Sequence, residues 1–497
     1  MFLTLAFAAL AIQPPPAPQA DDAAPDRHGD PNQLTEQAIP VVDYEAAGRA
    51  ALAERLAIER REGPARNVVV FIADGMDVTT TTAARILGGQ RGGGMGEENV
   101  LAFETLPHIA LAKTYNTDAQ VPDSAGTATA ILSGRKTKAG MINVDQTVAR
   151  GDCEGARGHR MPTLADLGAE TGRAVGVVTT ARLTHATPAA LYASSPDRDW
   201  ESDADLQVGS ACVDIARQLI ERRNALNIEV ALGGGARAFT PGGPGGGERE
   251  DGRDLIADWA QDGAVVRDEA GLSAARDAEG PVLGLFADSH MDYDADRGPE
   301  QPSLARMTRF AIDRLSRDPD GYVLLVEGGR VDHAHHAGNA ARALIDTLAF
   351  DEAVAAALDM VDLDETLVIV TADHGHTLAF QGYPRRGNPV LGIVRSVGAD
   401  GTRPETAADG RPYPTLAYAN GPGANHLLKA GGPRPDVTDD QAQNVDYRQV
   451  SAVPSFSETH GGQDVAVYAA GPGAWVVGGV LEQNVLYYVI ENALISP

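Results

Sequence analysis

The chain has 497 residues, 43% of them hydrophobic, which is enough to bury a large core in one large domain or in roughly two to three ordinary ones. Its 69 acidic residues outnumber 41 basic ones and give a formal net charge of -28. Nucleic acid and anionic membrane surfaces would repel such a chain, so neither is expected as a partner. Any anionic substrate must be attracted by cations held locally in a site.

The N-terminus has the pattern of a secretory signal peptide. An apolar run over 2–12 is followed by QPPPAPQA, which predicts a signal peptide over 1–20 with cleavage after Ala20. The run is too short to span a bilayer, and neither cysteine of the chain follows it directly, so no stable membrane anchor is expected. We therefore expect a periplasmic or secreted protein, with a flexible acidic linker over 21–40 before the folded part of the chain over 41–497.

Only two cysteines occur, Cys153 and Cys212. In an exported protein they permit one disulfide, but two separate buried thiols fit the residues equally well.

Three apolar, strand-like segments each end in a carboxylate. They are 67–73 before Asp74, 322–326 before Glu327, and 366–372 before Asp373. In open α/β sheets the ligand crevice lies at the carboxyl ends of the strands, so these three side chains are expected to meet there.

Strand-like and helical segments alternate along the chain. Further strands are expected over 109–115 and 174–179, and helices over 46–61, 79–87, 163–171, 306–315 and 340–360. This alternation predicts a three-layer α/β/α fold with a large, mainly parallel central sheet. The motifs THATP and SSPDRDW are expected to form loops, and the Pro- and Gly-rich composition of about 381–455 predicts an inserted subdomain.

The segment YVLLVEGGRVDHAHH, over 322–336, carries the densest group of polar side chains. Asp332 and His336 are four residues apart, so one helical turn would direct both at a single point, a common way to offer two metal ligands. A solvated polar loop is the alternative reading, but histidines interleaved with carboxylates favour a metal.

The segment VPDSAGTATA predicts a tightly packed helix that begins near Ser124, with Asp123 or Ser124 as its N-cap. Capping alone explains a serine at this position. The same geometry also places a hydroxyl at the positive end of a helix dipole, where an anion binds well.

Sorted by chemistry, the polar residues at these strand ends make a metal-binding set. Six have the character of zinc ligands: Asp74, Asp332, Asp373, His336, His374 and His460. Glu327 and Thr187 offer oxygen atoms suited to magnesium. Core packing does not explain this set, because burying unpaired carboxylates and imidazoles would cost several kcal/mol.

At this point the motifs show a clear resemblance to a known family. IADGM, VPDSAGTATA, VVTTARLTHATP, DRDW, VEGGRVDHAHH, TADHGH and ETHGGQDVAVYA resemble alkaline phosphatase, in particular its vertebrate-type branch, from about Val41 to the C-terminus. The resemblance implies a metal-dependent phosphomonoesterase with two zinc ions and one magnesium ion per chain.

The resemblance also implies roles for individual residues. Ser124 would be the nucleophile and Arg198 would grip the phosphate. One zinc would be held by Asp332, His336 and His460, the other by Asp74, Asp373 and His374, and the magnesium by Asp74, Thr187 and Glu327. His185, near the magnesium, and His333, near the substrate, occupy the positions that distinguish the vertebrate-type branch.

Two larger features follow from the same resemblance. Cys153 and Cys212 match a pair that the vertebrate-type branch joins as a disulfide, and 381–455 resembles its interface subdomain, which implies a homodimer. Two positions depart from the family pattern. Asp77 stands where a second glycine is usual and adds a negative charge near the metals, and Ala287 replaces an acidic calcium ligand, so no fourth metal site is expected.

Three other functions are the alternatives to this reading. A sulfatase motif is broken at Gly155, two residues after Cys153. A phosphodiesterase built on the same metal core remains an alternative, which a comparison of phosphate mono- and diester turnover would separate. An inactive acidic metal- or phosphate-binding protein is disfavoured because both Ser124 and Arg198 are present.

Overall fold

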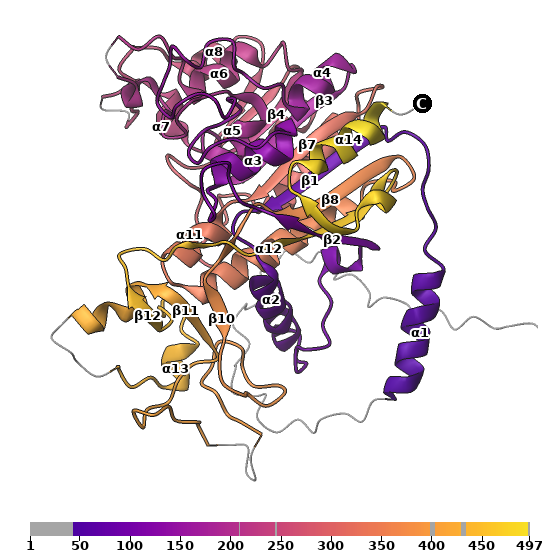
Figure 1. Ribbon diagram of the computed structural model, residues 1–497. Helices are drawn as coiled ribbons and strands as arrows, with labels where there is room; N and C mark the ends of the chain where they lie inside the picture. The colour runs from indigo at the N-terminus through magenta and orange to yellow at the C-terminus, as the bar shows by residue number, and fades with distance from the viewer. Residues whose placement is uncertain (1–42, 208, 244–245, 398–402, 429–433, 496–497) are drawn as a thin grey trace, which may run out of the picture.

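The computed structural model describes residues 43–495 with gaps at 208, 244–245, 398–402 and 429–433. The expected signal peptide over 1–20 and linker over 21–40 lie outside the described residues. Figure 1 shows a large sheet with helices on both faces, and a smaller group of strands beside it.

The central sheet has ten strands and is mixed but mostly parallel. In spatial order they are β15 (Gly479–Glu482), β2 (His108–Lys113), β14 (Val465–Ala470), β8 (Thr366–Ala372), β1 (Asn67–Ala73), β7 (Tyr322–Gly328), β3 (Ala174–Arg182), β4 (Ile228–Gly234), β6 (Val282–Leu285) and β5 (Ala264–Val266). Only β14 runs antiparallel to its neighbours, β2 and β8.

Helices cover both faces of this sheet. The helices of the described residues are α1 (Tyr44–Leu56), α2 (Val78–Arg91), α3 (Ser124–Ser133), α4 (Leu164–Glu170), α5 (Ala186–Tyr192), α6 (Ile215–Arg222), α7 (Ala236–Phe239), α8 (Leu255–Trp259), α9 (Glu269–Ala274), α10 (Leu304–Leu315), α11 (Arg330–His336), α12 (Ala340–Leu358), α13 (Asp439–Ala442) and α14 (Val485–Ile495). Two of them do not cover the sheet: α1 stands apart with no buried residue, and α13 lies in the segment 381–455 (Figure 1). Helix α12 packs against both α2 and α10, and α3 packs against α5 and α14. The three-layer α/β/α fold is confirmed. No helix among the described residues is long and apolar enough to cross a membrane.

The central strands are apolar along their whole length because they are covered on both sides. Every residue of β7 and β8 is buried, which explains why these strands read as continuous hydrophobic runs rather than alternating ones. Phe71 on β1 meets Phe350 on α12 edge to face, with ring centroids 5.9 Å apart.

One expected loop is a helix. THATP, which we expected in a loop, begins α5, with His185 as the N-cap residue and Thr187 inside the first turn. Pro188 does not prevent this, because the first N–H groups of a helix have no partner within the helix and a missing one costs nothing there. The stretch around Arg198 is irregular, as expected.

Within the segment 381–455 the chain forms structure of its own. A three-stranded sheet, ordered β10 (Leu378–Phe380), β11 (Leu416–Gly421) and β12 (Ser451–Pro454), stands apart from the central sheet in Figure 1, and its first strand lies just before residue 381. Two short strands, β9 (Gly375–His376) and β13 (His460–Gly461), then pair antiparallel where the chain leaves and re-enters the main body.

Cys153 and Cys212 form a disulfide, with Cα atoms 5.6 Å apart. This outcome confirms the pairing that the family resemblance implied and excludes two free thiols. The bond closes a loop that contains Arg198.

Candidate active site

The register of the central strands brings three carboxylates to one edge of the sheet. Strand β1 lies between β8 and β7, with Ala73 opposite Ala372 and Ile72 opposite Glu327. The residues that follow β1 and β8, Asp74 and Asp373, therefore leave the sheet side by side. All of these carboxylates are fully buried.

Helix α11 starts two residues after β7 and adds a second group. Asp332 Oδ1 lies 3.3 Å from His336 Nε2 and 3.2 Å from His460 Nε2. The two imidazole Nε2 atoms are 3.0 Å apart. Asp332, His336 and His460 therefore converge, and His460 reaches the other two from β13.

A neighbouring group contains the serine. His374 Nε2 lies 3.3 Å from Asp74 Oδ1 and 3.4 Å from Asp373 Oδ2. Ser124 Oγ is 3.1 Å from His374 Nε2 and 3.4 Å from Asp74 Oδ1. Asp123 is the N-cap of α3 and accepts a hydrogen bond from the backbone N–H of Gly126, so Ser124 is free to face the group.

The third group is formed by Asp74, His185 and Glu327, whose potential ligand atoms lie within 4.8 Å of one another. Thr187, in the first turn of α5, is fully buried. The hydroxyl of Thr179 donates a short hydrogen bond to Glu327 Oε2.

These residues fit metal ions. Several buried polar atoms have no hydrogen-bond partner: Asp74 Oδ2, Glu327 Oε1, Thr187 Oγ1, His185 Nδ1 and His374 Nδ1. Buried groups are normally paired, since an unpaired one costs about 1–3 kcal/mol. Divalent cations would satisfy the carboxylate and hydroxyl oxygens, and carboxylate with imidazole is a donor set that zinc accepts.

The charges of the site point the same way. Burial, with neighbouring carboxylates adding to it, raises the pKa of Asp74 well above its ordinary value, and burial raises that of Glu327 to about 8. Burial also lowers the pKa of His374, which keeps its imidazole neutral. Although burial raises the pKa of Asp332, His336 and His376 outweigh it and hold that pKa well below its ordinary value. The site thus combines neutral imidazoles with carboxylates that lack enough nearby positive charge. A cation would bind to such a combination.

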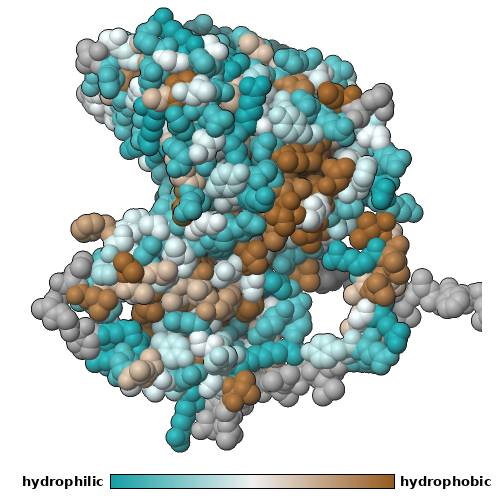
Figure 2. Space-filling view, in the orientation of Figure 1, coloured by the Kyte–Doolittle hydropathy of each residue, from teal (hydrophilic) through white to brown (hydrophobic). Residues whose placement is uncertain are grey.

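Arg198 brings a positively charged guanidinium group to the site. It donates to Asp123 Oδ2 at 3.1 Å and to His185 Nε2 at 3.1 Å. Its side chain is 18% exposed, that of His336 33% and that of His460 14%, so the site meets solvent on this side. Figure 2 shows the surface hollowed between the central body and the segment 381–455, where Figure 1 places α11.

His333 lies beside the third group rather than among the converging ligand atoms of α11. Its ring centroid is 4.1 Å from that of His290 and 5.3 Å from that of His185. His290 was not singled out from the sequence. Asp77, the departure from the family pattern, forms the N-cap of α2 and accepts from the backbone N–H of Thr80 at 2.8 Å.

Sequence reasoning missed two residues that touch the site. His376 Nε2 lies 2.9 Å from Asp332 Oδ1, and its Nδ1 lies 2.6 Å from Glu458 Oε2. Both residues were inside quoted motifs, TADHGH and ETHGG. The available signal was spacing, because His376 is two residues from His374 and Glu458 is two residues from His460.

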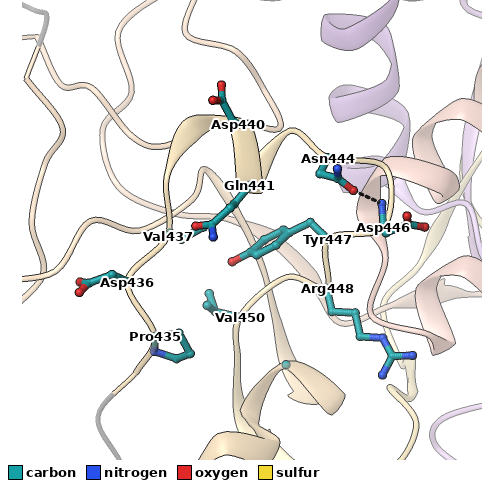
Figure 3. Close-up of a pocket in the computed structure, with 11 residues that line it drawn as sticks. Pro435, Asp436, Val437, Asp440, Gln441, Asn444, Asp446, Tyr447, Arg448 and Val450 are labelled. Carbon is teal, nitrogen blue, oxygen red and sulfur yellow. Dashed lines mark hydrogen bonds between the residues drawn. The ribbon is translucent and has the colours of Figure 1, made fainter.

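A cavity of about 570 Å³ in the segment 381–455 contains none of these residues. Figure 3 shows Tyr447 reaching across it between Val437 and Val450, with Asp440 and Arg448 at opposite ends. The chemistry of the chain is therefore assigned to the carboxylate and histidine groups at the sheet edge.

The raised pKa of Glu327 predicts how the metal-free protein responds to pH. Buried imidazoles with lowered pKa values are neutral in both folded and unfolded states above about pH 7, so they add no pH dependence there. A carboxyl whose pKa is raised from 4.5 to about 8 on folding contributes stability that is full below about pH 4.5 and is lost progressively as pH rises to about 8, so part of the loss falls between pH 7 and 8. The unfolding midpoint of metal-free protein should fall over this interval.

Thermal unfolding at a series of pH values tests this prediction. Metal-free Glu327→Gln should show a smaller fall, because the amide does not titrate. With metal restored, the fall should become smaller, since metal ions compete with protons for the Glu327 oxygens, while Asp346, whose pKa burial also raises to about 8, still contributes. A midpoint that rises or stays constant in the metal-free parent protein would contradict the prediction.

Comparisons with known proteins agree with this geometry. The family model for alkaline phosphatase matches residues 65–496. The tissue-nonspecific alkaline phosphatase of Gallus gallus is 40% identical over 493 residues, covering 94% of this chain and 90% of that protein. The membrane-bound alkaline phosphatase of Bombyx mori is 44% identical over 461 residues, covering 86% and 82%. The solved alkaline phosphatase of Thermus thermophilus is 27% identical with a TM-score of 0.63, covering 92% of this chain and 96% of that one. The chain belongs to the alkaline phosphatase family, whose members hydrolyse phosphate monoesters.

Proposed function

We propose that this chain hydrolyses phosphate monoesters through a phosphoserine intermediate on Ser124, at a site that holds two zinc ions and one magnesium ion. The observation that carries the proposal is the position of Ser124 Oγ, 3.1 Å from His374 Nε2 and 3.4 Å from Asp74 Oδ1 at the start of α3. No capping role explains that position, because Asp123 is the N-cap.

The metal ligands divide among the three groups. Asp332, His336 and His460 would hold one zinc, Asp74, Asp373 and His374 the other, and Asp74, Thr187 and Glu327 the magnesium, with His185 beside it. When bound, these ions would act as Lewis acids that stabilise the charge on the attacking and leaving oxygens.

The protein residues would then divide the reaction into two displacements. In the first, Ser124 Oγ forms a bond to phosphorus while the bond from phosphorus to the alcohol breaks. In the second, the oxygen of water displaces Oγ and releases inorganic phosphate. The N-terminus of α3 stabilises negative charge at Oγ. In the first displacement the Ser124 hydroxyl loses its proton to solvent and the departing alcohol oxygen gains one, and in the second the water loses a proton and Ser124 Oγ regains one. Because the bound ions would stabilise the charge on the departing oxygen, no protein acid is required to protonate the alcohol.

Arg198 would bind the phosphoryl oxygens. A guanidinium offers two parallel N–H donors, a geometry that a lysine cannot match. Asp123 accepts from Nη1 at 3.1 Å and so holds the fork toward Ser124. His333, one turn from His336, would lie on the substrate side of the magnesium group.

The covalent mechanism predicts different outcomes for two variants. Ser124→Ala should abolish the phosphoenzyme, because the nucleophile is lost, and lower kcat/KM by several orders of magnitude. Arg198→Ala should still form phosphoenzyme but more slowly, with weaker phosphate inhibition. Labelled phosphate trapped from a monoester at acidic pH measures both. Label on Ser124→Ala, or none on the parent protein, would refute the mechanism. Parallel turnover of a phosphate diester tests the phosphodiesterase alternative.

The ligand sets also predict metal content. Elemental analysis of active protein should find about two zinc and one magnesium per chain, because two groups combine imidazole with carboxylate and the third is rich in oxygen. Glu327→Ala should lose magnesium and retain zinc, which provides a matched control. Full activity with a single metal per chain would contradict the assignment.

We also propose that the protein is a homodimer joined through the segment 381–455. This segment exposes large apolar side chains, including Tyr383 at 83% and Val453 at 59%. Figure 2 shows a second apolar surface over α14, where Tyr488 is half exposed. Light scattering should give twice the mass of one chain, and Tyr383→Asp should shift it toward one chain, whereas Tyr488→Asp should not. A parent protein with the mass of one chain would contradict the dimer.

Export to the periplasm or the medium is the proposed localisation. The apolar run over 2–12 has the form of a signal peptide, and the Cys153–Cys212 disulfide is suited to an oxidising compartment. N-terminal sequencing of exported protein should begin near residue 21, and protein that stays inside the cell with its first residues intact would refute this.

A further inference from the structure

Asp77 is a buried carboxylate just outside the metal groups, and its surroundings give it a second contact besides the helix cap. Only 1% of the residue is exposed. While Oδ1 accepts from Thr80, Oδ2 accepts a short hydrogen bond from Nε2 of Gln463. Gln463 lies two residues beyond β13, at the far end of the sequence.

The same amide group makes one more contact. Gln463 Nε2 also donates to the backbone carbonyl of His376 at 2.8 Å. A primary amide has two N–H donors, so both are used, one on Asp77 and one on His376. Three segments that carry metal-site residues are thereby tied together: the loop after β1, strand β9 and the chain after β13.

Gly375 leaves the space in which the side chains of Gln463 and Asp77 meet. A Cβ atom on Gly375 would lie 2.6 Å from Gln463 Nε2 and 2.7 Å from Asp77 Cβ, closer than such atoms approach. The side chains of Asp77 and Gln463 therefore occupy the volume that any side chain at position 375 would need. Aspartate at 77, glycine at 375 and glutamine at 463 form one packed unit.

The hydrogen bonds of Gln463 to Asp77 and to the His376 backbone affect the metal groups through His376. The His376 ring is held at both nitrogens, by Asp332 Oδ1 at 2.9 Å and Glu458 Oε2 at 2.6 Å. Glu458 is fixed in turn by the backbone N–H of Thr377 at 2.7 Å. Holding the His376 carbonyl fixes the backbone that carries this ring, and the ring orients the Asp332 carboxylate toward His336 and His460.

We propose that Asp77 and Gln463 are positioning residues that set the geometry of the Asp332, His336 and His460 group by fixing the backbone of His376. The inference rests on the proposed zinc site. Residues that orient metal ligands typically change metal affinity by about 10- to 100-fold when replaced.

The variant Gln463→Glu tests the hydrogen bonds from Gln463 to Asp77 and His376 with almost no change in side-chain volume. It places a carboxyl group against the Asp77 carboxylate and against the His376 carbonyl. Such a group has no donor when ionised and one when protonated, so at least one of the two hydrogen bonds is lost. Competition with a chromogenic zinc chelator should show zinc affinity reduced about 10- to 100-fold. Turning the side chain over cannot rescue the variant, because a carboxyl group supplies at most one donor and Gln463 uses two.

The double variant Asp77→Asn with Gln463→Glu separates positioning from stability. The amide introduced at position 77 can donate to the carboxylate introduced at position 463, while its oxygen still caps α2. The melting temperature of the metal-free double variant should therefore return toward that of the parent. The donor to the His376 carbonyl is not restored, so zinc affinity should stay low. This variant also decides the matter if Gln463→Glu alone does not fold.

Gln218→Glu is the matched control. Its Nε2 donates to two backbone carbonyls, of Ser194 at 3.0 Å and Val213 at 2.9 Å, and touches no candidate metal ligand. It should lower the melting temperature without changing zinc affinity. Parent-like zinc affinity in folded Gln463→Glu, or recovery of zinc affinity together with melting temperature in the double variant, would overturn the positioning role. A parent protein that binds no zinc would instead overturn the proposed function, and the inference with it.

Discussion

The structure depends on the convergence of four buried carboxylates, Asp74, Glu327, Asp332 and Asp373, at one edge of a parallel sheet. Like charges in a desolvated site repel one another, and burial alone disfavours each charged form. Arg198 supplies one positive charge close by and His376 is held as a second between Asp332 and Glu458. The remaining imbalance suits the site to divalent cations. Once bound, such cations would attract a phosphate dianion in a chain whose net charge is -28.

The fold makes this convergence possible because its strands are fixed on both faces. Strands β8, β1 and β7 are apolar throughout and lie in parallel register, so the carboxylates at their ends are separated by the spacing between strands. Packing of this density leaves little freedom to relax, as the edge-to-face contact between Phe71 and Phe350 illustrates. The helices contribute their N-termini: α3 presents Ser124 and α5 presents His185 and Thr187.

Local sequence patterns were sufficient to predict the strands and the helical turn that carry part of the site. The bounds of β1 and β8 were predicted to the residue, because each is an apolar run ended by Asp-Gly or Asp-His. The turn of α11 that aligns Asp332 with His336 follows from their spacing alone. The helix at α5 was missed because its Thr-Pro sequence resembles a loop, and proline is tolerated only in the first turn. Spacing could have marked His376 and Glu458 as candidates, but the contacts of His376, Glu458 and Gln463 could not be predicted, because they depend on the pairing of β9 with β13.

That pairing also links the metal groups to the segment 381–455. The segment lies between β9 and β13 in the sequence, so its own folding decides where His460 returns to the sheet edge. A buried chain of contacts supports the return: Tyr418 on β11 lies 2.7 Å from His335 Nδ1, and His335 Nε2 lies 3.1 Å from the Thr80 hydroxyl on α2. Glu458 adds a second link, since its backbone N–H donates to the carbonyl of His336 at 2.9 Å while its carboxylate holds His376. A change that loosens the sheet of β10, β11 and β12 should therefore reach the Asp332 group first and the Asp74 group last, because Asp74 and Asp373 are anchored directly to the central strands.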